Sequence, residues 1–268
     1  MDSPLRWAGS KRQLVPKLVT FWKNPSARYI EPFCGSARLF FAIEPNQALL
    51  GDLNGELITT YRALKGDVEL VLHCLRRLRK GETSYYRIRD LDPNELSDAT
   101  RAARFIYLNK FCFNGIYRTN LSGKFNVTFG PPKTSWTFDE DMLVDASRAL
   151  KSARLLNLDF EETLAQARPG DFAFIDPPYA VLRRRVFREY GRNSFSVKDL
   201  NRLESCLHNL NRRGVAFVVS YCDCAEARKL MEPWRRRRVW TRRNIAGFTG
   251  SRRGAYEILG TNISSNMK

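Results

Sequence analysis

A short polar turn directly after an apolar run is the most distinctive feature of the sequence. Asp176, Pro177, Pro178 and Tyr179 follow residues 172–175, which are all apolar. Such a run is typical of a strand that is buried on both faces of a mostly parallel sheet. Ligands bind at the carboxyl ends of strands in open α/β sheets, so the turn stands where a binding site is expected. A proline-rich turn with a capping aspartate is the alternative interpretation.

These residue types suit the transfer of a methyl group to an amino group on an aromatic ring. The nitrogen of such an amine is a poor nucleophile, because its lone pair is delocalised into the ring. Two acceptors that hold its N–H groups would aim the lone pair. The carboxylate of Asp176 supplies one acceptor, and the backbone carbonyl of Pro177, held by the restricted proline backbone, can supply the other. Tyr179 offers a face for stacking, and positioning then supplies most of the effect without a covalent nucleophile.

A second group of residues predicts a nucleoside site. Glu31 ends an apolar run, Gly35 lies in a turn of small residues, and Asp52 follows twenty-one residues after Glu31 at the end of the next apolar run. This order resembles half of a nucleotide-binding domain, in which the second acid accepts the ribose hydroxyls. The phosphate-binding GxGxxG fingerprint is absent, which a cofactor without phosphate permits. Taken alone, the pattern could equally be an ordinary strand, turn and helix.

Alternating strands and helices are expected to position both groups. A helix is expected directly after the glycine turn. The apolar runs that predict strands are residues 29–33, 48–52, 154–158, 172–175, 215–219 and 256–259. The fold class is therefore α/β, with a Rossmann-like, mostly parallel sheet.

The middle of the chain has a different pattern. Apolar residues recur at helical spacing over residues 68–78 and again over 102–109. Residues 124–129 alternate as one arm of a hairpin would, with Ser122 and Gly123 at its turn. We therefore expect a helical insert that carries a hairpin. The predicted domains are a catalytic domain in two parts, 1–56 and 146–268, around an insert at 57–145.

The charge of the chain points to a polyanionic partner. Its formal net charge is +17, and residues 181–268 hold 20 basic and 7 acidic side chains. Arginine clusters of this density favour nucleic acid over a membrane surface.

The six cysteines form no CxxC pair and only two histidines accompany them, so no metal site is expected. No run reaches the length of a membrane helix and the first residues lack a signal-peptide pattern, so we expect a soluble cytoplasmic protein. We also expect it to be monomeric in solution.

Taken together, these motifs resemble the Dam-like family of DNA adenine methyltransferases over about residues 5–260. The matching segments occur in the family's order, with the cofactor motifs first, the insert next and the DPPY motif last. They are residues 6–11, 31–37, 51–54, 108–110, 113–115, 118–123, 125–127 and 176–179. The resemblance implies a Rossmann-like fold that uses S-adenosylmethionine, without a metal, to methylate adenine N6 in duplex DNA.

The resemblance also implies roles for individual residues. The catalytic residues are Asp176, Pro177 and Tyr179. The expected cofactor-binding residues are Trp7 and Lys11 at the methionine end, Asp159 and Phe160 at the adenine ring and Asp52 at the ribose, together with Glu31, Phe33, Gly35 and Asp176. The expected DNA-binding residues are Arg118, Asn120, Lys124 and Asn126 in the hairpin, and Arg184 and Arg185 on phosphates.

Some alternatives stay open at this point. Relatives that recognise GATC commonly carry other residues where this chain has Thr119, Ser122 and Thr128, so the target sequence is not predicted. Methylation of cytosine N4 is the close alternative, because the same turn could seat that amine. An inactive DNA-binding relative has no use for the intact site residues, and the net charge argues against a protein-glutamine substrate. A restriction nuclease as a partner is left open.

Overall fold

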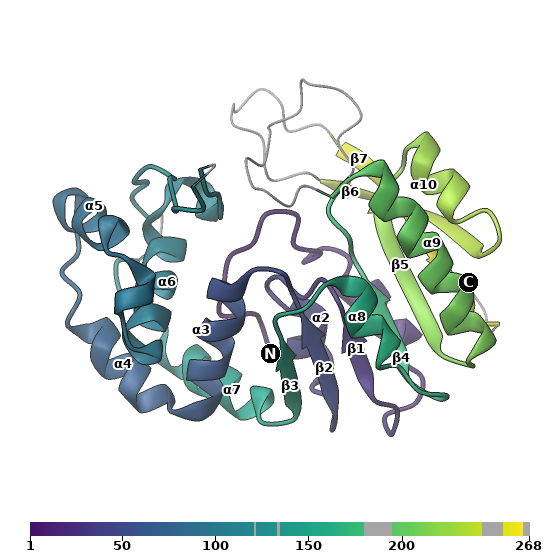
Figure 1. Cartoon of the computed structure of the whole chain (residues 1–268), viewed down its shortest axis with the longest axis horizontal. Helices are drawn as coiled ribbons and strands as arrows, with labels where there is room; N and C mark the ends of the chain where they lie inside the picture. The colour runs from purple at the N-terminus through teal and green to yellow at the C-terminus, as the bar shows by residue number, and fades with distance from the viewer. Residues whose placement is uncertain (121, 133–134, 180–194, 243–253, 265–268) are drawn as a thin grey trace.

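A seven-stranded sheet forms the centre of the computed structural model, which describes residues 1–120, 122–132, 135–179, 195–242 and 254–264 (Figure 1). The strand order is β3-β2-β1-β4-β5-β7-β6. Strands β1 to β5 are parallel, and β7 is inserted antiparallel between β5 and β6. The strands are β1 (Tyr29–Glu31), β2 (Ala48–Gly51), β3 (Ala153–Leu156), β4 (Phe172–Ile175), β5 (Ala216–Cys222), β6 (Arg235–Arg242) and β7 (Gly254–Thr261). This topology confirms the predicted α/β class with a mostly parallel sheet.

Six of the seven strands coincide with predicted apolar runs, with small differences at their ends. Strand β1 ends at Glu31 rather than at residue 33, where Pro32 brings no N–H group to a ladder. Strands β5 and β7 are longer than predicted, because they pair with each other over five residue pairs that include Cys222 and Glu257.

Strand β6 was not predicted. Its first four residues, Arg235 to Arg238, are exposed arginines, which hide the alternation that a half-buried strand shows. The side chains of Val239 and Thr241 are buried and anchor the strand to the core. The strand lies at the edge of the sheet, where charged side chains discourage pairing with another chain. The arginine cluster is therefore part of the sheet as well as a charged surface.

Helices cover both faces of the sheet. They are α1 (Val15–Leu18), α2 (Arg38–Ile43), α3 (Gly55–Gly66), α4 (Val68–Arg76), α5 (Glu82–Asp90), α6 (Asp98–Phe111), α7 (Glu140–Leu150), α8 (Phe160–Ala165), α9 (Val197–Arg212) and α10 (Ala225–Leu230). Helices α8, α9 and α10 bury apolar side chains against one face, whose core includes Ile30, Ala173 and Val219. Helices α1, α2, α3 and α7 cover the other face, which presents Tyr29 and Phe174.

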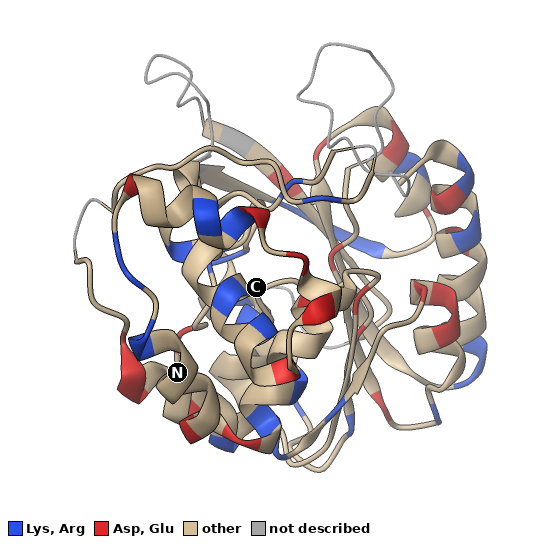
Figure 2. Cartoon of the chain, turned by 60° about the vertical axis from the view of Figure 1, so that its left-hand side comes forward, with Lys and Arg blue, Asp and Glu red and all other residues tan. Residues whose placement is uncertain are grey.

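Helices α4, α5 and α6 lie to the side of the sheet, beyond α3 (Figure 1). The predicted helical runs are confirmed in α4 and α6, whose first turns are capped by the side chains of Asp67 and Ser97. Their apolar residues continue the core beneath α3, so the insert is not packed as a separate body. Figure 2 shows basic residues on these helices as well as on β6 at the far end of the sheet.

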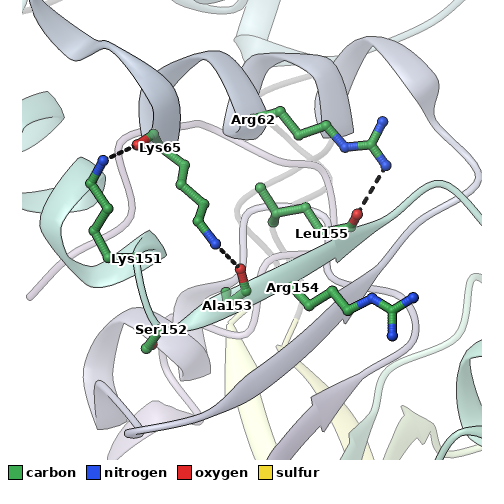
Figure 3. Close-up of a pocket in the computed structure, with 7 residues that line it drawn as sticks. All are labelled: Arg62, Lys65, Lys151, Ser152, Ala153, Arg154 and Leu155. Carbon is green, nitrogen blue, oxygen red and sulfur yellow. Dashed lines mark hydrogen bonds between the residues drawn. The ribbon is translucent and has the colours of Figure 1, made fainter.

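The outer edge of the sheet is capped by basic side chains from α3 (Figure 3). Lys65 Nζ donates to the carbonyl of Ala153 at 2.7 Å, and Arg62 Nη2 donates to that of Leu155 at 2.9 Å. The shallow cavity between them, about 390 Å³, is also lined by Lys151 and Arg154. These cations satisfy edge carbonyls of β3 that would otherwise be open to another chain.

The described residues contain neither a membrane-spanning helix nor a group of metal ligands. No helix among them is long and apolar enough to cross a membrane. They also hold no group of three or more potential metal ligands. All six cysteines are free thiols.

Candidate active site

The predicted catalytic turn leaves the sheet at the carboxyl end of β4, and residues far apart in sequence meet there. Lys11 Nζ lies 3.0 Å from Asp176 Oδ1 and donates to the Tyr179 hydroxyl at 3.3 Å. The same ammonium lies 5.3 Å from the centre of the Tyr179 ring. The Tyr179 ring also packs at a steep angle against the ring of Tyr221, with 5.2 Å between the ring centres. Lys11, Asp176 and Tyr179, which sequence analysis assigned separately, therefore form one cluster.

A fourth member of this cluster, Glu257 on β7, was missed by sequence analysis. Its carboxylate is buried and accepts a hydrogen bond from the Tyr179 hydroxyl at 2.9 Å. Lys11 Nζ lies 3.6 Å from the other carboxylate oxygen. A glutamate in an otherwise buried strand was the available signal, because a carboxylate is rarely buried without a partner.

Burial and charge set the protonation of the cluster. Burial raises the pKa of Asp176 to about 6, although Lys11 opposes the shift and Glu257 adds to it. Burial alone would lower the pKa of Lys11, but Asp176, Tyr179 and Glu257 outweigh it and the pKa is raised. Burial also raises the pKa of Tyr179. The cluster therefore holds a lysine ammonium, a neutral phenol and, above about pH 6, an Asp176 carboxylate.

The predicted nucleoside turn lies at the carboxyl ends of β1 and β2. Asp52 Oδ2 accepts a hydrogen bond from the Gly35 N–H at 2.9 Å, and Oδ1 accepts one from the Asn54 N–H at 2.9 Å. Gly35 has φ +44°, and a Cβ at this position would lie 2.7 Å from Trp7 Cδ1. Glycine is required here both by the backbone conformation and by the indole ring against it. Asp52 thus shapes the turn, and burial raises its pKa.

Glu31 and Trp7 support this turn from two sides. Glu31 is buried beneath it and accepts a hydrogen bond from the Tyr29 hydroxyl at 2.8 Å. Burial raises the pKa of Glu31, and the nearby Asp176 and Asp52 add to the shift. The ring of Trp7 stacks on Tyr117 of the insert, with 5.8 Å between ring centres. Trp7 therefore joins the predicted nucleoside turn to the predicted insert.

A group of aromatic rings lies beside the turn. Phe33 stacks on Phe160 at 5.2 Å between ring centres, and Phe195 packs against both. Asp159 caps the first turn of α8 and forms an ion pair with Arg202 at 2.5 Å. The structure thus brings together Phe33 and Phe160, two of the predicted cofactor residues, whereas the carboxylate of Asp159 is engaged by Arg202.

The predicted hairpin is present but irregular. It has an isolated bridge between Thr119 and Phe125, and those of its residues that the structure describes form no strand. Asn120 Oδ1 accepts hydrogen bonds from the backbone of residues 122 and 124, both at 3.0 Å, so this side chain holds the turn. Two backbone hydrogen bonds, from Asn120 N–H to Lys124 and from Asn126 N–H to Arg118, also pair the two arms.

The other predicted DNA-binding residues are distributed as follows. Arg118 Nε donates to Asn126 Oδ1 at 2.9 Å across the hairpin. The side chain of Lys124 is exposed. Arg184 and Arg185 lie outside the described residues.

Comparison with known proteins decides the family. Residues 7–245 match the family described as D12 class N6 adenine-specific DNA methyltransferase. The chain belongs to this family. The methyltransferase is 32% identical to the type II methyltransferase M1.LlaDCHI of Lactococcus lactis subsp. cremoris, over 97% of this chain and 95% of the relative. It is 31% identical to the type II methyltransferase M.MjaIII of Methanocaldococcus jannaschii, over 95% and 96%. It is 28% identical to the DNA adenine methylase of Escherichia coli K12, over 95% and 93%.

These matches confirm the predicted resemblance and the predicted activity, which is methylation of adenine in DNA. The methyltransferase matches these relatives over nearly their whole length. The roles of individual site residues and the domain boundaries stay predictions.

Proposed function

We propose that the methyltransferase binds S-adenosylmethionine along the carboxyl ends of β1 and β2 and presents Asp176 to the amino group of adenine. The supporting observation is the contact of Lys11 with Asp176 and Tyr179 at the same edge of the sheet as the Asp52 turn. In a parallel sheet with this order, that edge is the ligand-binding edge.

The residues present fit a positively charged nucleoside without a phosphate. Asp52, Asp176 and Glu257 bring three acidic side chains to this edge, and Lys11, which contacts the last two, brings one ammonium. The carboxylate of Asp52 can still accept further hydrogen bonds from ribose, because a carboxylate has about four acceptor positions. Phe33 and Phe160 supply an apolar wall for an aromatic base. When bound, S-adenosylmethionine supplies a methyl group activated on sulfonium.

The catalytic turn then acts by holding the target amine. The Asp176 carboxylate accepts one N–H bond and the carbonyl of Pro177 accepts the other, which directs the nitrogen lone pair out of conjugation. Tyr179 stacks on the base. Lys11 fixes the Asp176 carboxylate from its other side. The proton that the methylated nitrogen releases passes to Asp176 or to water.

Activity should fall in acid as Asp176 takes up a proton. Its pKa is about 6, and only the carboxylate can accept an N–H bond with both oxygens. We expect kcat/KM to be constant above about pH 7 and to fall about tenfold per pH unit well below about pH 6. Initial rates measured across this range test the proposal, with stability checked by circular dichroism at each pH. A kcat/KM that is unchanged down to about pH 5 contradicts it.

We assign DNA recognition to the insert, residues 57–145, and the chemistry to residues 1–56 and 146–268. The target adenine must leave the duplex to reach the turn at Asp176, at an unstacking cost of about a few kcal/mol. The hairpin is the element that we expect in the major groove, with the guanidinium of Arg118 held by Asn126 for contact with a base edge. Asn120 shapes this loop. Arg184 and Arg185 are proposed to contact phosphates.

Two hairpin residues should give separable effects on DNA binding. Arg118→Ala is expected to reduce the preference for the cognate site, because it removes a base-edge donor worth about 1–3 kcal/mol of discrimination. Lys124→Ala should weaken cognate and scrambled duplexes alike and reduce the log–log salt slope by about 0.9. Fluorescence anisotropy across a salt series measures both. An Arg118→Ala variant that loses both duplexes equally would show that this division of roles is wrong.

The oligomeric state, the cellular location and a partner nuclease are also proposed. A single chain carries both the catalytic turn and the hairpin, so we infer that it acts as a monomer in the cytoplasm, where DNA and the methyl donor are available. A cognate nuclease is suggested by the type II names of two relatives. Light scattering with and without duplex measures the oligomeric state.

A further inference from the structure

A buried carboxylate on β7 completes the polar cluster around Asp176. Glu257 is 6% exposed. Its Oε1 accepts a hydrogen bond from the Tyr179 hydroxyl at 2.9 Å, and its Oε2 lies 3.4 Å from Ser220 Oγ, a donor, and 3.6 Å from Lys11 Nζ. A carboxylate this deeply buried needs partners, and the cluster supplies two hydroxyl groups and an ammonium.

Glu257 reaches the cluster because of the inserted antiparallel strand. Strand β7 pairs with β5, and Glu257 stands opposite Cys222, two residues beyond Ser220. Tyr221 of β5 packs against the Tyr179 ring. The ring is therefore fixed at its hydroxyl by Glu257 and along its side by Tyr221.

We propose that Glu257 is a positioning residue for methyl transfer, which holds the Tyr179 ring at the base and shares the Lys11 ammonium with Asp176. This inference rests on the proposed function, in which Asp176 accepts an N–H bond of adenine. Lys11 lies 3.0 Å from Asp176 Oδ1 and 3.6 Å from Glu257. An ammonium shared by two carboxylates withdraws less charge from each. Asp176 is therefore a stronger hydrogen-bond acceptor for the amine than it would be if Lys11 paired with Asp176 alone.

The charge of Glu257 also provides a readout that a purely structural role would not change. The groups that face Asp176 are Lys11, which lowers its pKa, and Glu257, which raises it. The acidic Glu31 on β1 is also coupled to Asp176. Removing the negative charge at residue 257 should lower the pKa of Asp176. The acid limb of kcat/KM then moves to lower pH, even as the maximal rate falls.

The variant that tests this is Glu257→Gln, which keeps an acceptor oxygen for Tyr179 but removes the charge. We expect kcat to fall about tenfold to a hundredfold, as for a small misplacement of a catalytic group, with KM for DNA within about threefold. The fall of kcat/KM in acid should occur at a lower pH than in the unchanged enzyme. Asp171→Asn is the matched control, since Asp171 is an equally buried carboxylate paired with Arg28 at the opposite end of β4. The control should lose stability but keep kcat and the acid limb.

Two further comparisons sharpen the test: a double-mutant cycle where Glu257→Gln folds, and Ser220→Ala, which keeps the test decisive where Glu257→Gln is poorly folded. Tyr179→Phe removes the hydroxyl that Glu257 holds, so the double variant should be at most about threefold slower than the slower single variant. Ser220→Ala removes another donor to Glu257 without changing its charge, and it should lower kcat with the acid limb in place. Fully multiplicative losses in the double variant, or an unmoved acid limb in Glu257→Gln, overturn the inference. If the unchanged enzyme makes no N6-methyladenine, the proposed function itself fails instead.

Discussion

Asp176→Ala is expected to reduce the single-turnover rate of methyl transfer about a hundredfold to a thousandfold, the scale on which one preorganised polar contact acts in the transition state. The variant removes the acceptor that aims the adenine nitrogen and leaves the Lys11 ammonium with Glu257 as its remaining carboxylate in the cluster. Binding of the methyl donor should weaken at most several-fold, because the Asp52 turn is intact. Rapid-quench measurement with preformed enzyme–DNA complex gives the chemical step.

Two controls separate this effect from damage to the fold. Asp171→Asn changes another buried, ion-paired carboxylate next to β4 and should leave the single-turnover rate unchanged. Thermal unfolding of both variants shows what each substitution costs in stability. An Asp176→Ala rate within tenfold of the unchanged enzyme, a difference of about 1.4 kcal/mol in the barrier, contradicts the catalytic role.

Asp52→Ala is expected to act mainly on binding of the methyl donor. The loss of a charge-assisted contact to ribose costs about 1.5–3 kcal/mol, which raises the Kd about tenfold to 150-fold. The structure adds a second cause, since the same carboxylate holds the N–H groups of Gly35 and Asn54 in the turn. The rate at saturating donor should fall much less than the affinity. Isothermal titration calorimetry measures the Kd.

Asp52→Asn is the matched variant for this prediction. The asparagine keeps one acceptor oxygen, so it can hold one of the two N–H groups of the turn but offers less to ribose. Its Kd should lie between those of the unchanged enzyme and Asp52→Ala. An unchanged Kd in both folded variants would place the ribose elsewhere.

The fold and the main site residues could be predicted where local pattern and topology agree. The run before Asp176 is apolar because β4 is buried on both faces, and the same holds for the short strand that ends at Glu31. Parallel strands place the residues after them at one edge of the sheet, which is why Asp176 and Glu31 lie near each other there. The helical insert could be predicted because apolar residues recur at helical spacing in α4 and α6, where one face of each helix is buried.

Other features depend on pairings that no local pattern encodes. Glu257 belongs to the site only because β7 enters the sheet antiparallel beside β5. Lys11 meets Asp176 across 165 residues of sequence, and the stretch around it has little regular structure. Strand β6 was hidden by its arginines, which are tolerated because the strand is at an edge. The hairpin was found, but the internal use of Asn120 was not, since it depends on the turn geometry.

The most direct test of the central claim is the identity of the methylated nucleoside. Duplex DNA incubated with the purified enzyme and isotopically labelled S-adenosylmethionine is digested and analysed by mass spectrometry, with Asp176→Ala in parallel. We predict label in N6-methyladenine, none in N4-methylcytosine, and no label above background with the variant. Label in N4-methylcytosine, or equal labelling by Asp176→Ala, would contradict the account of how this site selects and activates adenine.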